Sequence, residues 1–224
     1  MTILIATGLK REAQILGGPG ILAIPGGGRA QALEAAAEGA EAIASLGIGG
    51  ALAPGLQTGD WVVATEILAD GLSAPTDAAW AAAIAQRLPG ARTGAILGSD
   101  AMLIRAAEKA DAHRRYGALA VDMESHVAAR VAARLGLPFA AARVVSDAAD
   151  RDLPDAVTVG MTPDGGMALG AVLWALAKRP AQLPALIRAG REAEIAFRAL
   201  ADARRLLGPR IGRADLVQLA LDVG

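Results

Sequence analysis

Acidic residues follow two apolar segments of the chain at points where a strand would end. Asp122 and Glu124 come directly after apolar residues 118–121, and Asp147 follows apolar residues 139–145. A strand, a helix over residues 125–135 and a second strand form a unit of the length that makes two strands parallel. Parallel strands end at one edge of the sheet, which is where open α/β sheets bind ligands. We therefore expect these acids to share one pocket.

A further acid, Glu12, comes to the same edge if the first strand, residues 2–6, is also parallel. The plain alternative for each carboxylate is a helix cap, which satisfies free N–H groups and stabilises a helix by about 1 kcal/mol. Acids gathered from three segments at one sheet edge favour a binding or catalytic cluster instead. Their types suit proton transfer and hydrogen bonding to hydroxyl groups.

Short apolar runs bounded by Gly or Pro alternate with Ala-rich segments, which predicts strands alternating with helices. We expect strands at residues 2–6, 21–24, 44–47, 60–66, 93–97, 118–121 and 139–145. We expect helices at residues 29–45, 125–135, 167–177 and 183–207, and a loop over residues 153–166. The prediction is one α/β domain over residues 1–224, with a mixed central sheet flanked by helices and a helical C-terminal region from about residue 167.

The composition excludes several classes of protein. With 54% hydrophobic and 20% charged residues the chain folds around a large core, and a net charge of −1 gives no field that attracts nucleic acid. The absence of cysteine removes disulfides, zinc–cysteine sites and thiol nucleophiles. We expect no metal or organic cofactor, no transmembrane helix, and, without a secretory signal, a cytoplasmic protein.

The two histidines do not add to the expected site. His126 follows Ser125 on a helix and is expected to be structural or exposed. His113 lies among Lys109, Arg114 and Arg115, which together are expected to form a solvated helical face.

Several motifs resemble those of the nucleoside phosphorylase superfamily, which includes the methylthioadenosine/S-adenosylhomocysteine nucleosidases. The segments that carry the resemblance are AVDMESHVAARVAARLGLPF at residues 120–139, RVVSD at 143–147 and GIGGALAPGLQTGDWVV at 47–63. Within the superfamily, IATGLKRE at 5–12, LAVDMESH at 119–126 and RPAQLP at 179–184 look most like the hopanoid-associated phosphorylases. The resemblance implies the three-layer αβα fold of that superfamily.

The resemblance also implies an enzyme that cleaves the N-glycosidic bond of an adenine nucleoside, and the hopanoid subtype implies adenosylhopane as the substrate. Asp147 matches the acid that protonates the departing purine, with Ser146 beside it. Glu124 matches the carboxylate that binds the ribose hydroxyls, with Met123 against the sugar, and Glu12 matches the glutamate that holds the attacking water. Four further residues are expected to contact substrate, namely Met102, Leu103, Gly49 and Gly50.

The nucleophile is left open between water and inorganic phosphate. If phosphate is used, Gly28 and Arg29 at a predicted helix start offer N–H groups and a guanidinium to bind it; the plain alternative is a tight turn. The alternative enzyme is a methylthioadenosine/S-adenosylhomocysteine nucleosidase, and the alternative of another class is a noncatalytic nucleoside-binding protein, which would need no acid at Asp147. Relatives also imply a homo-oligomer.

The C-terminal helices carry apolar residues next to basic ones. Trp174 and its apolar neighbours are followed by Lys178 and Arg179, and then by Leu183 and further apolar residues. This pattern suits peripheral contact with a membrane that holds a lipid-linked substrate. The plain alternative is a helix that covers the sheet with its apolar residues in the core. We expect residues 153–190 to line the 5′ end of the nucleoside site.

Overall fold

The structure is a computed structural model, and it describes residues 2–26, 30–160, 162, 165–166 and 168–213. The strands are β1 (Thr2–Ala6), β2 (Ile21–Ile24), β3 (Ala40–Ala51), β4 (Trp61–Ala69), β5 (Leu72–Pro75), β6 (Arg92–Gly98), β7 (Ala120–Asp122) and β8 (Phe139–Asp147). The helices are α1 (Lys10–Leu16), α2 (Ala30–Ala36), α3 (Ala78–Arg87), α4 (Ala106–Tyr116), α5 (Ser125–Leu135), α6 (Asp155–Gly160), α7 (Leu169–Lys178) and α8 (Leu183–Leu207), with a short 3₁₀ turn at Pro180–Gln182.

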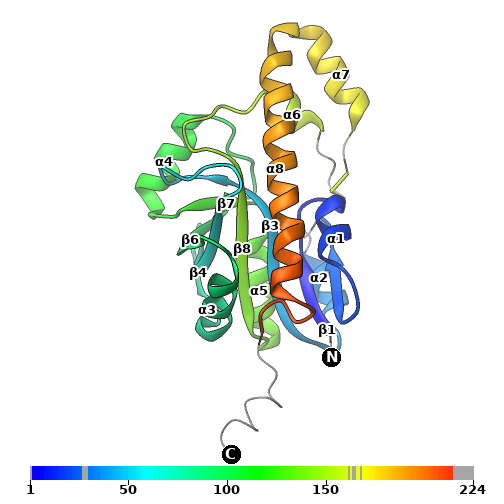
Figure 1. Cartoon of the computed structure of the whole chain (residues 1–224), viewed down its shortest axis with the longest axis vertical. Coiled ribbons are helices and arrows are strands. Elements are labelled where there is room, and N and C mark those ends of the chain that lie inside the picture. The colour runs from blue at the N-terminus through cyan, green and yellow to red at the C-terminus, as the bar shows by residue number, and fades with distance from the viewer. Residues whose placement is uncertain (1, 27–29, 161, 163–164, 167, 214–224) are drawn as a thin grey trace, which may run out of the picture.

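All eight strands belong to one mixed sheet in the order β2-β1-β3-β7-β6-β4-β5, and β8 pairs with both β3 and β4. Strand β3 is parallel to β1 and β8 and antiparallel to β7. Strand β4 is parallel to β6 and antiparallel to β5 and β8. The pairings from β3 through β7, β6, β4 and β8 return to β3, so the sheet curls into a closed ring of five strands with β2, β1 and β5 as extensions (Figure 1).

Helices cover the sheet from both sides and give the predicted α/β architecture with a mixed central sheet. One core joins the sheet to α3 and the lower part of α8, through side chains such as Trp80, Ile84 and Leu200. A second core joins the sheet to α2 and α5 through Leu33 and Val131. Helix α8 runs from the first core to the opposite end of the molecule, where α6 and α7 lie (Figure 1).

Two predicted elements were wrong in their extent. The helix expected over residues 29–45 ends at Ala36, and residues 40–51 form the long strand β3 instead. Gly39, at φ +75°, makes the turn between them. Residues 153–166, expected to be a loop, contain the short helix α6. Alanine packs equally well in either element, so an Ala-rich run with few other signals misleads the periodicity.

The C-terminal helices begin and end close to the predicted residues, at Leu169–Lys178 and Leu183–Leu207. Over the described part of the chain, none of the helices combines the length and the hydropathy needed to cross a membrane.

Candidate active site

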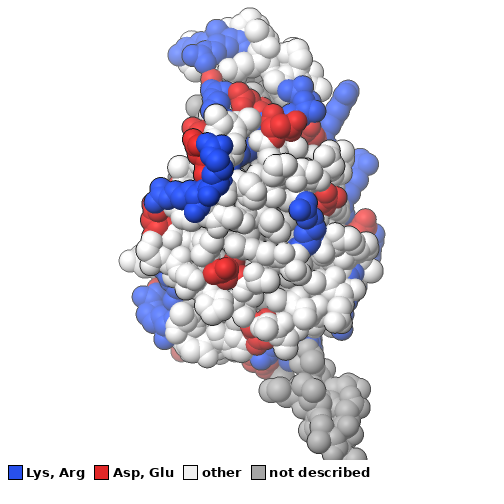
Figure 2. All heavy atoms as spheres, turned by 90° about the vertical axis from the view of Figure 1, so that its left-hand side faces the viewer, with Lys and Arg blue, Asp and Glu red and all other residues white. Residues whose placement is uncertain are grey.

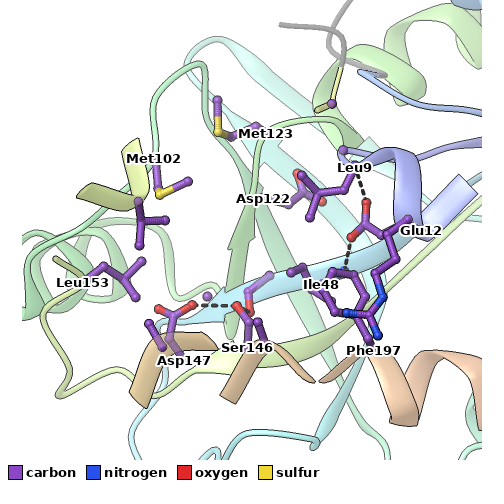
Figure 3. Close-up of a pocket in the computed structure, with 18 of the residues that line it drawn as sticks. Leu9, Glu12, Ile48, Met102, Asp122, Met123, Ser146, Asp147, Leu153 and Phe197 are labelled. Atoms are coloured by element: carbon purple, nitrogen blue, oxygen red, sulfur yellow. Dashed lines mark hydrogen bonds between the residues drawn. The ribbon is translucent and has the colours of Figure 1, made fainter. Parts of the chain in front are cut away.

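The predicted acids meet in one cavity of about 770 Å³. Its lining includes Glu12, Asp122, Glu124, Ser146 and Asp147. Figure 3 shows Ser146 and Asp147 on one side of the cavity and Glu12 on the other, with Asp122 and Ile48 between them. The expectation of a shared pocket at the ends of these strands is therefore met, although the strands reach it in an unexpected way.

The strands before Asp122 and Asp147 are not the parallel pair that the sequence led us to expect. Strand β7 runs antiparallel to β3 and β8 runs parallel to it, so β7 and β8 have opposite directions. They still deliver their acids to one place, because Gly50 of β3 pairs with Val121 on one side and with Asp147 on the other. Both acids therefore lie next to the C-terminal end of β3, one on each side of it.

Of the two predicted glycines, Gly49 is required by space, and Gly50 leaves room for the carboxylate of Asp147. A Cβ at Gly49 would lie 2.8 Å from the carbonyl oxygen of Val121, and a Cβ at Gly50 would lie 3.2 Å from Oδ2 of Asp147. Both residues line the cavity. They bring backbone against backbone and leave the carboxylate uncovered.

Glu12 is held rigidly at the start of α1. Its Oε2 accepts the N–H of Leu9 at 2.7 Å, and its Oε1 accepts the N–H of Ile48, from the distant strand β3, also at 2.7 Å. The residue is 1% exposed. Glu12 therefore caps its own helix, as the plain alternative holds, and it also presents a fixed carboxylate to the cavity.

Arg143 is the buried cation of the acidic cluster. Its Nη2 lies 2.5 Å from Oδ2 of Asp122 and 3.7 Å from Oε2 of Glu124, and it also donates to Oγ of Ser45 at 2.7 Å. The other oxygen of Asp122 accepts from the backbone and hydroxyl of Ser125 at 3.0 and 2.7 Å. Asp122 is therefore a helix cap and an arginine partner, and Glu124 is left to face the cavity.

Two glutamates of the cluster hold their protons more tightly than usual. Burial, with the neighbouring Asp122 adding to it and Arg143 opposing it, raises the pKa of Glu124 to about 8. Burial also raises the pKa of Glu12, against the opposing effect of the N–H groups of Ile48 and Leu9. Glu124 can therefore take up or release a proton near neutral pH.

Asp147 ends β8 and is partnered on both oxygens. The hydroxyl of Ser146 lies 2.6 Å from Oδ1 and 3.1 Å from the carbonyl oxygen of Gly49. The ammonium group of Lys109 on α4 contacts Oδ2. The Asp147 side chain is 7% exposed and lines the cavity, so it is both fixed and within reach of a ligand.

Lys109 corrects the interpretation of α4 as a solvated face. Its side chain is fully buried, whereas Arg114 and Arg115 are exposed. Helical spacing could have predicted this burial, because Lys109 lies three residues before the buried Ala112 and therefore on the same face of α4. His113 is partly buried and contacts the carbonyl oxygen of Ala118 at 2.8 Å.

His126 is structural. It is 2% exposed and packs so closely on Gly98 that a Cβ there would clash with the Cβ and the ring of His126. Its Nε2 lies 3.0 Å from Oδ1 of the exposed Asp100.

The remaining predicted substrate contacts lie in the cavity wall. Met102, Leu103 and Met123 line it, and Figure 3 shows Met102 and Met123 across the cavity from Asp147 and Ser146. Gly28 and Arg29, the predicted phosphate site, lie outside the described residues. Within the ranges that the structure describes, no three His, Asp or Glu residues are grouped so as to hold a metal ion.

The part of the cavity formed by α6, α7 and the start of α8 is apolar, and we call it the apolar end. It is lined by Ala156, Val157, Val172, Leu186, Ala189, Gly190 and Ala193. Two further apolar residues of the lining, Leu153 and Phe197, lie near Asp147 and Ile48 (Figure 3). The residues of α8 recur every three or four positions, so they form one face of the helix. The middle of this face is Ala, Gly and Ala, and the small side chains widen the cavity.

The chain was compared with known proteins. A family model described as the Phosphorylase superfamily matches residues 9–178. No curated protein sequence matches the chain. The fold is similar to that of a 5′-methylthioadenosine/S-adenosylhomocysteine nucleosidase from Neisseria meningitidis in complex with methylthio-immucillin-A, at a TM-score of 0.66 and 17% identity, covering 91% of this chain and 97% of that one.

Two further solved structures are similar. One is the nucleosidase of the same name from Streptococcus pneumoniae with a transition-state inhibitor, at a TM-score of 0.59 and 18% identity over 91% of this chain and 99% of that one. The other is a mutant nucleosidase from Helicobacter pylori with 5′-methylthioadenosine in its active site, at a TM-score of 0.61 and 14% identity over 90% of this chain and 97% of that one. The fold class expected from the sequence is thereby confirmed, and the family match over residues 9–178 places the chain in the phosphorylase superfamily.

Proposed function

We propose that this protein is an enzyme that cleaves the N-glycosidic bond of an adenine nucleoside with a large apolar 5′ substituent, adenosylhopane, and releases adenine for hopanoid biosynthesis. The observation that carries the proposal is the two-part cavity. Carboxylates line one end, and apolar side chains of α6, α7 and α8 line the other. At about 770 Å³ it lies in the upper part of the range of about 300–1,000 Å³ found for small-molecule sites.

Each acid has a place in the reaction. Breaking the bond between ribose and adenine builds positive charge on the sugar and negative charge on the base. Asp147, oriented by Ser146, protonates the departing adenine. Glu124 accepts hydrogen bonds from the ribose hydroxyls and stabilises the charged sugar, and Glu12 receives a proton from the attacking nucleophile. Met102 and Met123 supply soft apolar surface for the base and the sugar.

Water is the nucleophile that this charge arrangement favours. Of the cations near the acids, Arg143 is already paired with Asp122 and Arg11 with Glu194. Glu12 is fixed in the cavity wall by two backbone N–H groups, and a water molecule can donate a further hydrogen bond to its carboxyl group. We therefore favour hydrolysis, and Arg29 remains the candidate for phosphate binding if the reaction is phosphorolysis.

A methylthioadenosine/S-adenosylhomocysteine nucleosidase is the second candidate, favoured by the fold and by the same three acids. The two candidates differ in what fills the apolar end of the cavity. A methylthio group is short, so the face formed by Ala189, Gly190 and Ala193 would be left largely unfilled. A hopane skeleton is long and apolar, and its burial there would contribute binding energy in proportion to the area covered.

Product analysis tests the proposal. Purified protein is incubated with adenosylhopane in detergent or with 5′-methylthioadenosine, each with and without phosphate, and adenine and the sugar product are measured. We expect adenine release without phosphate and a higher kcat/KM for adenosylhopane. Strict dependence on phosphate would overturn hydrolysis, and a higher kcat/KM for methylthioadenosine would favour the second candidate. No adenine release from either would favour the noncatalytic binding protein.

A variant within the apolar end sharpens this comparison. Ala193→Phe narrows the cavity at α8 and should lower kcat/KM for adenosylhopane by at least about 10-fold, because overpacking a filled apolar site costs about 1–3 kcal/mol. Activity on methylthioadenosine should change little. Ala201→Phe on the same helix is the matched control, since Ala201 does not line the cavity. An equal loss on both substrates would contradict this assignment of the apolar end.

We also propose that the tip formed by α7 and the start of α8 contacts the membrane from which such a substrate comes. Trp174 is 66% exposed, and Leu183 and Ile187 are 44% and 48% exposed. Lys178 lies over the Trp174 ring at 5.0 Å, and Arg179 pairs with Asp155 at 2.6 Å. Figure 2 shows basic side chains, with acidic ones between them, at this end of the molecule. The tip continues into the cavity wall, because Val172 and Leu186 line the cavity.

Flotation with anionic vesicles tests the membrane contact. Trp174→Ala and the charge reversal of Lys178 and Arg179 to Glu should each reduce the bound fraction of protein, with Trp61→Phe, a change in the core, as the control. Equal binding by parent and tip variants would contradict the contact. The homo-oligomer implied by relatives is tested by light scattering during gel filtration.

A further inference from the structure

Lys109 is a fully buried ammonium group that the chemistry proposed above does not yet use. Besides Oδ2 of Asp147, its Nζ donates to the carbonyl oxygens of Ala148 at 3.1 Å and Arg151 at 3.0 Å. An ammonium has three hydrogens, and these three acceptors use all of them. The group is therefore held in one position, with its charge directed at Asp147.

Burying a lysine is costly unless its charge is compensated. An apolar residue at the same place on α4 would pack against the sheet without that cost. The carboxylate of Asp147 compensates the charge, and among the described residues it is the only acid in an ion pair with Lys109. Because the buried ammonium of Lys109 destabilises the fold unless it is paired and lies against Oδ2 of Asp147, we expect its role to be connected with Asp147.

The role follows from what happens to Asp147 during turnover. In the resting enzyme Asp147 is the carboxylate paired with Lys109, and it must first take up a proton from solvent on Oδ1. As the bond between C1′ and the purine breaks, the electron pair of that bond goes to the adenine ring and the proton moves from Asp147 to a ring nitrogen. Asp147, whose side chain is 7% exposed, is then a carboxylate again, and the Lys109 ammonium against Oδ2 stabilises it without any rearrangement.

We propose that Lys109 is a positioning residue that fixes the Asp147 carboxyl group and stabilises the carboxylate left after Asp147 protonates the departing base. The inference rests on the proposed function. It predicts that Lys109 affects the chemical step through Asp147 and not through substrate binding. In the simpler role, Lys109 only holds residues 147–151 against α4. Replacing it would then lower kcat by the same factor whether or not residue 147 is a carboxylate.

A double-mutant cycle separates the two roles. Lys109→Met, Asp147→Asn and the double variant are compared with the parent for kcat and KM, with adenine release from the substrate that the parent turns over. Lys109→Met should lower kcat by about 10- to 100-fold and leave KM within about 3-fold, as expected for a lost hydrogen bond to a charged group. In the Asp147→Asn background the same change should cost less than about 3-fold.

Two further variants complete the design. Arg114→Met removes a cation from the exposed face of the same helix and should leave kcat unchanged. If Lys109→Met does not fold by circular dichroism, Lys109→Gln takes its place, because an amide keeps two donors but carries no charge. An equal loss of kcat in the parent and in the Asp147→Asn background would overturn the proposal in favour of the fastening role.

A measurement without turnover keeps this result apart from a failure of the proposed function. The urea concentration at the midpoint of unfolding is measured for the four proteins of the cycle at one pH. Lys109 of α4 is the charged group that the described contacts place against Asp147, and Ser146 of β8 is a neutral partner. Lys109→Met should lower the midpoint of the parent, whereas in the Asp147→Asn background, where the buried ammonium has lost its acid, the same change should leave the midpoint unchanged or raise it. An equal fall in both backgrounds would refute the electrostatic role whatever reaction the enzyme catalyses.

Discussion

Replacing Glu124 by glutamine should remove much of the dependence of this protein's stability on pH. Burial raises the pKa of Glu124 from 4.5 to about 8, with the neighbouring Asp122 adding to the effect. Between about pH 4.5 and 8 the folded protein therefore holds a proton that the unfolded chain has released. The free energy of unfolding consequently falls as the pH rises through this window, because the folded state binds more protons.

The size of the effect follows from the difference between the two pKa values. Each unit corresponds to about 1.4 kcal/mol, so the limiting loss of stability between pH 4.5 and pH 8 is about 5 kcal/mol. The side chain is 14% exposed and is partly compensated by Arg143, at 3.7 Å. We therefore expect about 2–4 kcal/mol, which corresponds to roughly 5–15 °C in Tm for a chain of this size.

Urea unfolding at a series of pH values from 5 to 9 measures this. The curve of the parent should fall with rising pH, and the curve of Glu124→Gln should fall less by about 2–4 kcal/mol, since an amide does not ionise. Some slope should remain, because burial also raises the pKa of Glu12. Glu38→Gln, at an exposed position of the turn after α2, is the matched control. Parallel curves for parent and Glu124→Gln would refute the reasoning.

Three further outcomes are expected. Asp147→Asn should lower kcat for adenine release by about 10²–10⁴-fold with an unchanged circular dichroism spectrum, because an amide cannot protonate the base; near-parental release would exclude Asp147 as the acid. Gly8→Ala should lower kcat/KM by at least about 10-fold, since its Cβ would lie 2.9 Å from Oε1 of Glu124, whereas Gly170→Ala, with open space around it, should be neutral. A nucleoside inhibitor should bind more tightly as the pH rises toward 8 and should release protons in calorimetry, because ribose hydroxyls favour the ionised Glu124; binding that does not vary with pH would place the ribose elsewhere.

The sequence was sufficient to find the acids and the strands that carry them. The strands that end at Asp122 and at Asp147 stand out because apolar runs with polar ends are distinctive in any fold. It was not sufficient to find the direction of β7. A strand of three residues that pairs antiparallel with the end of β3 depends on contacts between distant segments, and the usual rule for a strand, a helix and a strand gives the wrong direction here.

The predictions for residues 40–45 and for Lys109 failed for other physical reasons. Alanine and serine carry little information about which face is buried, so β3 resembles the end of a helix until its partners β1 and β8 are known. Lysine is normally exposed, and Lys109 is buried because the carboxylate of Asp147 and the carbonyl oxygens of Ala148 and Arg151, from another part of the chain, are its partners. In both places the deciding contact is with residues far away in the sequence.

The ring of strands that includes β3 has a consequence for how the active site forms during folding. Glu12 comes early in this sequence, whereas its partner Ile48 comes from the later strand β3, and the cation Arg143 and the acid Asp147 both come from β8. Bringing such segments together has to offset the entropy of closing long loops before the contacts stabilise the chain. A chain that ends before β8 lacks both Arg143 and Asp147, and β8 is also the strand that joins β3 to β4 and completes the ring. In a refolding experiment we therefore expect the first turnover to follow the docking of β8.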